Sequence, residues 1–240
     1  MALFVLSDLH LSTAVETDKS MEVFGHRWQN YTERIQKNWS ALVDENDTVV
    51  IGGDVSWALS LEEATSDFSF LHALPGKKII LKGNHDFWWT TLQKMTNFLN
   101  ANGFCNMAFL QNNAFLCDSF IICGSRGWFY ETDTAAAATG ADYDKMIARE
   151  AHRLSLSLTQ GKALQESLEK ETELIAFLHF PPIWNGAVCE PILQTLKDFG
   201  IKRCYFGHIH GVSETSFEAE GIEFILTAAD ALGFMPKAIF

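Results

Sequence analysis

The sequence predicts an α/β protein with a largely parallel sheet and a second group of strands in the middle of the chain. Of its 240 residues 48% are hydrophobic and 12% are aromatic, which suffices for a sizeable core and excludes a disordered chain. Short apolar runs alternate with longer amphipathic segments in the first part of the chain and again from Leu174. Strand-sized runs separated by helix-sized segments are typical of βαβ units.

The first part of the chain contains three of these strand and helix pairs. The second helix has a recognisable start, because Ser60 and Glu63 have the spacing of a capping box, in which a hydroxyl and a carboxylate bind backbone N–H groups at the helix end. In chain order the pairs are Leu3–Leu6 with Tyr31–Val43, Thr48–Ile51 with Leu61–Leu74, and Lys78–Leu81 with Trp88–Asn100.

The middle of the chain has closely spaced short strands in place of this alternation. The runs Phe109–Leu110, Ala114–Leu116 and Phe120–Cys123 predict a hairpin or meander that begins a second sheet. The alanine-rich stretch Asp133–Gly140 is interpreted as an exposed loop or lid. An amphipathic helix from about Asp142 to Leu158 is expected to pack on one of the sheets.

Strands and helices alternate again in the last part of the chain. Strands at Leu174–Leu178 and Cys204–Phe206 flank a helix at Pro191–Phe199, and late strands are expected near Val212–Phe217 and Glu223–Thr227. No internal repeat, charge block or low-complexity linker interrupts the sequence. We therefore expect a single domain over residues 1–240.

Charge and cysteine content restrict the partners and the compartment. The 30 acidic residues exceed the 18 basic ones, giving a net charge of -12 that disfavours binding to a nucleic-acid polymer. The first residues do not resemble a secretory signal, and no stretch is apolar enough to span a membrane, so no membrane partner is expected. The five cysteines form no CxxC pair and have apolar neighbours, which indicates reduced thiols in a cytoplasmic protein.

Polar residues that can bind metal ions follow five of the predicted strands. Ligands of open α/β sheets bind at the carboxyl ends of the strands, so these segments are expected to converge. Residues two apart in an extended segment point to the same side, which lets such a pair bind one metal or two adjacent ones. Asp, Asn and His without thiolates suit Mn, Fe or Zn rather than Ca. The segments are Asp8-Leu9-His10, Gly52-Gly53-Asp54, Gly83-Asn84-His85-Asp86, His179 and Gly207-His208-Ile209-His210.

These five segments, in this order, resemble the pattern of the calcineurin-like metallophosphoesterases: D-x-H, G-D, G-N-H-[DE], a lone H and G-H-x-H. The sequence also resembles a bacterial phosphohydrolase subgroup, through Trp-Ala-Leu-Ser after Asp54 and Phe-Trp-Trp after Asp86. The resemblance covers most of the chain. It implies a four-layer α/β/β/α sandwich, with two mixed sheets and helices on the outer faces.

The resemblance also implies two divalent metal ions, with Mn favoured over Fe or Zn, that generate hydroxide for attack on a phosphate ester. His85 is expected to be catalytic, protonating the leaving oxygen or stabilising charge on the phosphoryl group. Asp86 would orient the ring of His85, or would cap the helix predicted near Trp88. Asp8, His10 and His210 would hold the first metal, Asn84, His179 and His208 the second, and Asp54 would bridge the two.

Substrate contacts are less well marked in the sequence. Many family members have a second aspartate three residues after the bridging one, and Trp57 in that position argues against the protein phosphatase branch. Trp57, Trp184 and Arg126 are candidate substrate contacts. Loop packing is the alternative for the tryptophans, and a surface ion pair for Arg126. His26, His72 and His152 match no segment of the pattern and are interpreted as surface or helix residues; substrate contact is the alternative for His26, which lies beside Arg27.

We therefore expect a metal-dependent phosphoesterase that acts on a small phosphorylated substrate, with a small-molecule or nucleotide phosphodiester preferred. A phosphomonoesterase or nucleotide pyrophosphohydrolase is the alternative. A non-catalytic scaffold on the same fold is disfavoured, because no ligand position of the pattern is missing. The oligomeric state remains open at this stage.

Overall fold

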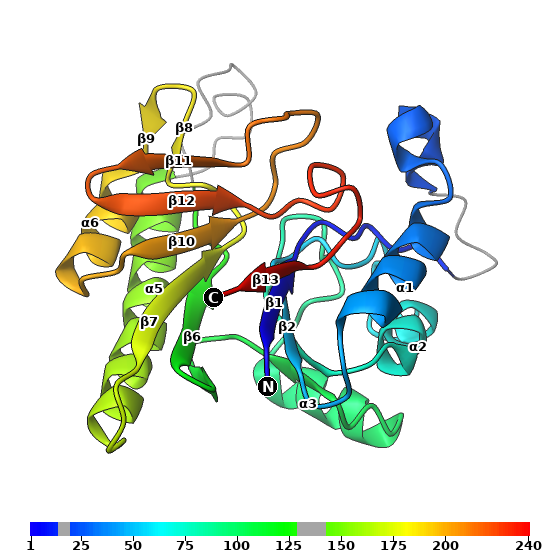
Figure 1. Ribbon diagram of the computed structural model, residues 1–240, viewed down its shortest axis with the longest axis horizontal. Helices are drawn as coiled ribbons and strands as arrows, with labels where there is room; N and C mark the ends of the chain where they lie inside the picture. The colour runs from blue at the N-terminus through cyan, green and yellow to red at the C-terminus, as the bar shows by residue number, and fades with distance from the viewer. Residues whose placement is uncertain (14–19, 129–142) are drawn as a thin grey trace.

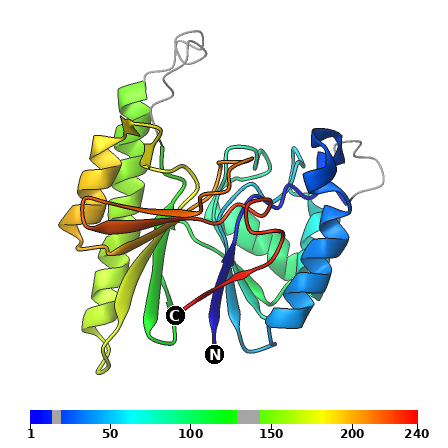
Figure 2. The same cartoon turned by 45° about the horizontal axis from the view of Figure 1, so that its top comes forward.

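Two large sheets lie face to face between two layers of helices in the computed structural model, which describes residues 1–13, 20–128 and 143–240 (Figures 1 and 2). The predicted four-layer α/β/β/α arrangement is thereby confirmed. The segment Asp133–Gly140, interpreted as a lid, lies outside the described residues. None of the described helices is long and apolar enough to cross a membrane.

The first sheet has the order β13-β1-β2-β3-β4, with β1 to β4 parallel and β13 antiparallel to β1. Three helices cover its outer face, where Trp39, Phe68 and Met95 join Val49 and Ile51 in one buried cluster. The strands are β1 (Leu3–Leu6), β2 (Thr48–Ile51), β3 (Lys77–Ile80), β4 (Met107–Phe109) and β13 (Lys237–Ile239), and the helices are α1 (Tyr31–Leu42), α2 (Thr65–Ala73) and α3 (Leu92–Ala101).

The second sheet has the order β11-β12-β10-β7-β6-β5 and is parallel from β12 to β6. Its outer face is covered by α5 and α6, which bury Leu154, Leu158 and Ile192 against it. The strands are β5 (Phe115–Cys117), β6 (Phe120–Ser125), β7 (Glu173–Leu178), β10 (Arg203–Phe206), β11 (Ser216–Ala219) and β12 (Ile222–Leu226), and the helices are α5 (Tyr143–Glu166) and α6 (Glu190–Asp198).

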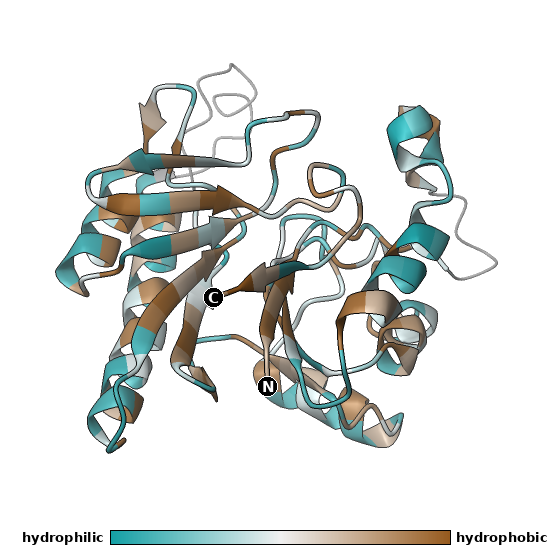
Figure 3. Cartoon of the chain, in the orientation of Figure 1, coloured by the Kyte–Doolittle hydropathy of each residue, from teal (hydrophilic) through white to brown (hydrophobic). Residues whose placement is uncertain are grey.

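A third buried cluster joins the two sheets. Val5 and Val50 from the first sheet meet Ile122, Phe177 and Tyr205 from the second, and the rings of the last two stack with centroids 5.1 Å apart. Strands covered on both faces are apolar along their whole length, which is visible as hydrophobic ribbon at the centre of Figure 3. This double burial explains why the sequence shows continuous apolar runs instead of alternation.

The predicted hairpin in the middle of the chain is partly wrong. The strand at Phe109 is the end of β4 and pairs with β3, so it completes the first sheet; the second sheet begins with the hairpin of β5 and β6. Asn113 explains the difference, because its side chain accepts a hydrogen bond from the N–H of Gln111 and donates one to the carbonyl of Phe109. These bonds shape a connection between the sheets in place of a tight turn.

Two helices begin later than predicted. The Ser60 hydroxyl accepts from the N–H of Glu63, but the Glu63 carboxylate binds Leu59, so residues 61–64 form a turn before α2. Helix α3 begins at Leu92 with Thr91 as its cap. The short elements were missed because they show no periodicity. They are the 3₁₀ helices Met21–Phe24 and His26–Trp28, the hairpin strands β8 (Ile183–Trp184) and β9 (Ala187–Val188), and β13.

Candidate metal centre

Side chains that follow β1, β2, β3, β7 and β10 meet at one edge of the sandwich. Backbone hydrogen bonds join the segments there: Asp8 N–H donates to Gly53, and Gly207 N–H donates to the carbonyl of His179. Two groups of possible ligands result, each with its ligand atoms within 4.8 Å of one another. The first consists of Asp8, His10 and His210, and the second of Asp54, His179 and His208.

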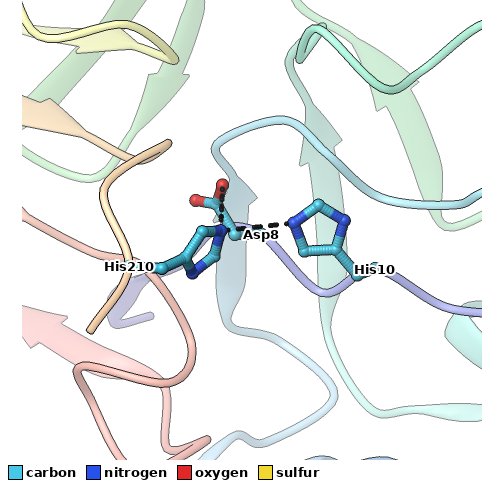
Figure 4. Close-up of side chains that lie close together, drawn as sticks. All are labelled: Asp8, His10 and His210. Carbon is cyan, nitrogen blue, oxygen red and sulfur yellow. Dashed lines mark hydrogen bonds and ion pairs between the residues drawn. The ribbon is translucent and has the colours of Figure 1, made fainter. Parts of the chain in front are cut away.

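The first group brings three ligand atoms to one point (Figure 4). Nε2 of His10 lies 3.3 Å from Nε2 of His210, which in turn lies 3.6 Å from Oδ1 of Asp8. The Asp8 carboxylate is fully buried and accepts hydrogen bonds from the Ser7 hydroxyl and the N–H of His208. Burial raises the pKa of Asp8, although nearby histidines favour its charged form. A bound cation would stabilise that charged form.

The second group includes Asn84 as well. Oδ1 of Asn84 lies 2.7 Å from Nε2 of His179 and 3.0 Å from Nδ1 of His208. Oδ2 of Asp54 lies 3.5 Å from Nε2 of His179 and 3.7 Å from Nε2 of His10, which belongs to the first group. One carboxylate oxygen therefore stands between the two groups, where a ligand shared by two metals would be.

The side chains of the second group suit a divalent cation. The Nδ1–H of His179 donates to the carbonyl of Gly52, so Nε2 of the neutral ring is an acceptor. This acceptor faces Asn84 Oδ1 and Asp54 Oδ2, which are acceptors too. Burial lowers the pKa of His179, but Asp54 and Asp8 outweigh it and raise the pKa to about 9, so without a metal a proton on Nε2 takes the place that the cation would occupy. The group thus attracts positive charge, and a metal ion supplies it with the ligand types present.

Asp230 is a functional candidate that the sequence analysis missed. Its Oδ1 lies 2.8 Å from Nδ1 of His210, and its Oδ2 accepts from the N–H of Gly211 and lies 3.3 Å from Arg27. A carboxylate on Nδ1 fixes the ring so that Nε2 faces the ligand group. The available signal was the one used for the other ligands, because Asp230 follows the apolar strand β12.

Replacing Asp230 by asparagine is expected to weaken metal binding by ~10–100-fold, because the His210 ring loses the charge that orients it. The affinity is measured by isothermal titration calorimetry of metal-free protein with Mn²⁺. Asp198→Asn on α6 is the matched control, since that carboxylate binds Gln194 on the exposed face of the helix. Equal affinities of the Asp230 variant and the control would exclude this positioning role.

The backbone of the site is unusual. Asp8, His10, Asp54 and His208 all have positive φ values, of 59°, 45°, 50° and 69°. The left-handed region costs non-glycine residues about 1–3 kcal/mol each, and four such residues meet at this one site. The extended geometry predicted for Asp8 and His10 is therefore wrong, although both side chains reach the same group. His208 and His210 lie in different groups.

Two glycines leave room for the ligands. A Cβ atom on Gly83 would overlap Oδ1 and the backbone N of Asp54, and one on Gly207 would overlap Oδ2 of Asp8. Both carboxylates are thereby packed directly against backbone. The glycines in the G-N-H and G-H-x-H segments are thus needed for close approach rather than for a special φ value.

His85 lies beside the two groups without belonging to either. Its N–H donates to Oδ1 of Asp54 at 2.7 Å, and its ring centroid lies 5.6 Å from that of His10 and 4.4 Å from that of Trp57. Burial lowers the pKa of His85. His85 is among the residues that line a cavity beside the first group.

Asp86 makes other contacts than those expected. Its carboxylate accepts hydrogen bonds from the N–H groups of Gly83, Asp54 and Val55 and from the indole of Trp88. These bonds tie the segment after β2 to the segment after β3. The carboxylate thus holds together the loops that carry the ligands. It does not cap α3, and its hydrogen bonds do not include the ring of His85.

A cavity of about 460 Å³ opens beside the first group. Of the three candidate substrate contacts, only Trp57 lines it, stacked on His10 with centroids 5.0 Å apart. Trp184 packs beside Phe206 and Phe217 of the second sheet. Arg126 binds Glu150 in another pocket, and His26 lines a third. The residues that line the cavity beside the first group are His10, Met21, Phe24, Arg27, Trp28, Trp57, His85, His210, Gly211 and Asp230.

Comparison with known proteins gives a family and a fold. The family model for calcineurin-like phosphoesterases matches residues 1–212. No curated protein matches the sequence. Phosphopantetheinyl hydrolase from Mycobacterium tuberculosis has 13% identity and a TM-score of 0.54, with 100% of this chain and 95% of that chain covered. The protein TT1561 of Thermus thermophilus has 11% identity and a TM-score of 0.55, with coverages of 99% and 97%. The TM-scores of these two structures indicate a shared fold, and at such low identities they indicate no more than the fold.

Proposed function

We propose, because this chain belongs to the calcineurin-like phosphoesterase family, that it hydrolyses a small phosphodiester at a centre of two divalent metal ions. Family membership makes it a metal-dependent phosphoesterase; the number of metals and the substrate are our proposal. The observation that carries the two-metal proposal is the position of Asp54 Oδ2 between the two ligand groups.

Two clusters of side chains support the proposed ligand sets. We assign Asp8, His10 and His210 to one cation, Asn84, His179 and His208 to the other, and Asp54 to both. When bound, two such cations polarise a phosphoryl group and lower the pKa of water, with Mn²⁺ proposed over Fe or Zn. The protein holds the ligands in place through Asp86 and Asp230, which bind backbone N–H groups and the His210 ring.

His85 supplies the proton that the leaving oxygen requires. It lines the cavity beside both groups, and its backbone N–H is fixed by Asp54. Trp57 packs against its ring and excludes water from that side. In this arrangement the side chain is free to donate a hydrogen bond into the cavity, because its backbone N–H and not its ring binds Asp54.

The walls of the cavity favour an aromatic group on the substrate. Phe24, Trp28 and Trp57 line it, and Arg27 is the basic residue among the lining residues. Phe24 is 69% exposed, so its ring is accessible to a ligand in the cavity. Aromatic walls stack nucleobases or aryl groups, so a nucleotide or aryl phosphodiester fits this cavity.

Removing one wall tests this preference. Phe24→Ala is expected to raise KM for an aromatic phosphodiester by ~5–150-fold, because a stacked base contributes about 1–3 kcal/mol, while kcat changes little. Steady-state kinetics with an aryl ester and a methyl ester of the same phosphate measure this. Phe240→Ala is the control, since that ring is 95% exposed at the end of the chain. An equal KM change for both esters would argue against stacking.

The substrate class is decided by a panel of p-nitrophenyl monoesters and diesters, nucleotides and dinucleotides, assayed with Mn²⁺. The proposal expects diesters to have the highest kcat/KM. A preference for monoesters or for pyrophosphate bonds would identify a phosphomonoesterase or a pyrophosphohydrolase instead. If the metal-loaded protein hydrolysed no member of the panel, the proposed function would be wrong.

A further inference from the structure

A cluster of basic side chains lies around a pocket that shares no lining residue with the cavity lined by Trp57. Lys82 follows β3, Arg126 follows β6, and Arg149 and Arg153 lie on α5. They surround Glu150, whose side chain is fully buried. Four of these five residues line one pocket, which Arg149 does not line. The cluster is concentrated positive charge in a chain whose net charge is -12.

Glu150 neutralises only a part of this charge. Its Oε1 lies 3.3 Å from Arg126 Nη2, 2.8 Å from Arg153 Nη1 and 3.9 Å from Arg149 Nε. With Lys82, four positive charges face one negative charge, which leaves a formal charge of +3. Burial lowers the pKa of Arg126, and the positive charges of Arg153 and Arg149 lower it further. The arrangement is one that an anion stabilises.

The cluster also contains a donor without an acceptor. Nε of Arg126 is buried and has no hydrogen-bond partner among the described residues. Oε1 of Gln111 and Oε2 of Glu150, which line the same pocket, are likewise buried and without a partner in the described part of the chain. Buried polar groups are nearly always hydrogen-bonded, so these atoms indicate a ligand or water that the pocket holds. Glu150 meanwhile fixes the guanidinium groups of Arg126 and Arg153 in place.

We infer that Lys82, Arg126 and Arg153 form a binding site for a phosphate group. Guanidinium groups bind phosphate oxygens through paired N–H donors, and the net charge of +2 that these three side chains keep beside Glu150 matches a phosphate dianion. The site adjoins the second ligand group, because the carbonyl of Arg126 accepts the N–H of His179 and Lys82 lies two residues before Asn84. The phosphate is a second anionic group of the substrate or free inorganic phosphate; the first source rests on the proposed function.

Binding is tested without using activity. Inorganic phosphate, compared with chloride at equal ionic strength, is expected to raise the thermal midpoint of the wild-type protein and of Asp54→Asn, which is expected to lose at least one metal. Arg153→Gln is expected to bind phosphate at least ~10-fold more weakly. The Arg153 side chain is 39% exposed, so we expect its replacement to leave the fold intact. Arg126→Gln would remove a more buried side chain, which is 16% exposed. Lys197→Gln, which breaks an exposed pair with Glu220, is the control.

Two outcomes would overturn the inference: no phosphate-dependent shift in Asp54→Asn, or equal affinity in Arg153→Gln and the control. The source of the phosphate follows from thymidine 5′-(p-nitrophenyl phosphate) assayed with and without a 3′-phosphate. A second phosphate on the substrate predicts a kcat/KM at least ~10-fold higher with the 3′-phosphate, and loss of that ratio in Arg153→Gln. Equal values in the wild type would assign free phosphate. Hydrolysis of neither compound would contradict the proposed function and leave the binding result standing.

Discussion

Asp54→Asn is expected to lose at least one of two bound metals and to lower kcat/KM by ~10³-fold, since two-metal stabilisation supplies several kcal/mol. Oδ2 of Asp54 lies within 3.7 Å of both ligand groups, and the substitution replaces an anionic ligand shared by two cations with a neutral amide. The amide keeps the volume of the side chain and an acceptor for the N–H of His85. Metal content after dialysis and steady-state kinetics measure the two effects.

Asp47→Asn is the matched control for this substitution. That carboxylate is also buried, but it accepts hydrogen bonds from Ala2 and Asp44 at the opposite end of β2. We expect the control to retain both metals and full activity while losing some stability, because its carboxylate holds a turn far from the ligands. Full metal content and turnover in the Asp54 variant would contradict the bridging assignment.

His85→Ala is expected to retain both metals and to lower kcat by ~10²–10⁴-fold, the range for general acid catalysis. The side chain lies outside both ligand groups, and the bond from its backbone N–H to Asp54 survives the substitution. A series of aryl diesters gives the sharper test. The defect should grow as the leaving group becomes more basic, because only a basic leaving oxygen needs the proton.

His72→Ala provides the comparison for His85, since His72 lies on α2 and binds Asn106 far from the centre. Its activity should equal that of the wild type across the whole ester series. A defect in His85→Ala that is the same for every leaving group would assign the residue to charge stabilisation and not to proton donation. Unchanged turnover would remove it from the mechanism.

The strands that carry the site were predictable because they are buried on both faces. Leu3–Leu6 and Thr48–Ile51 coincide with β1 and β2 to the residue, since each is a continuous apolar run that ends at a ligand segment. Helix starts were less predictable. Ser60 accepts its hydrogen bond from the N–H of Glu63 in a turn that precedes α2. The same pair of residues is thus compatible with a turn as well as with the start of a helix.

The convergence of the ligand segments was also predictable, because parallel strands place their carboxyl ends at one edge. The roles of these residues remain proposals. The sequence analysis did not include Asp230 and Arg27 as site residues. They are far apart in the sequence and belong to none of the five segments, so only the fold shows that they are in contact. Strand β13 was missed because its three residues show no periodicity, and only the fold brings them beside β1 at the beginning of the chain.

Activity as a function of bound Mn²⁺ is the most direct test of the two-metal centre. Metal-free protein would be loaded in steps, and hydrolysis of a diester would be measured at each ratio of bound metal to protein. The geometry of Asp54 between the two groups predicts that activity develops as the second equivalent binds and is constant beyond it. Full activity with one equivalent, or without metal, would contradict the account.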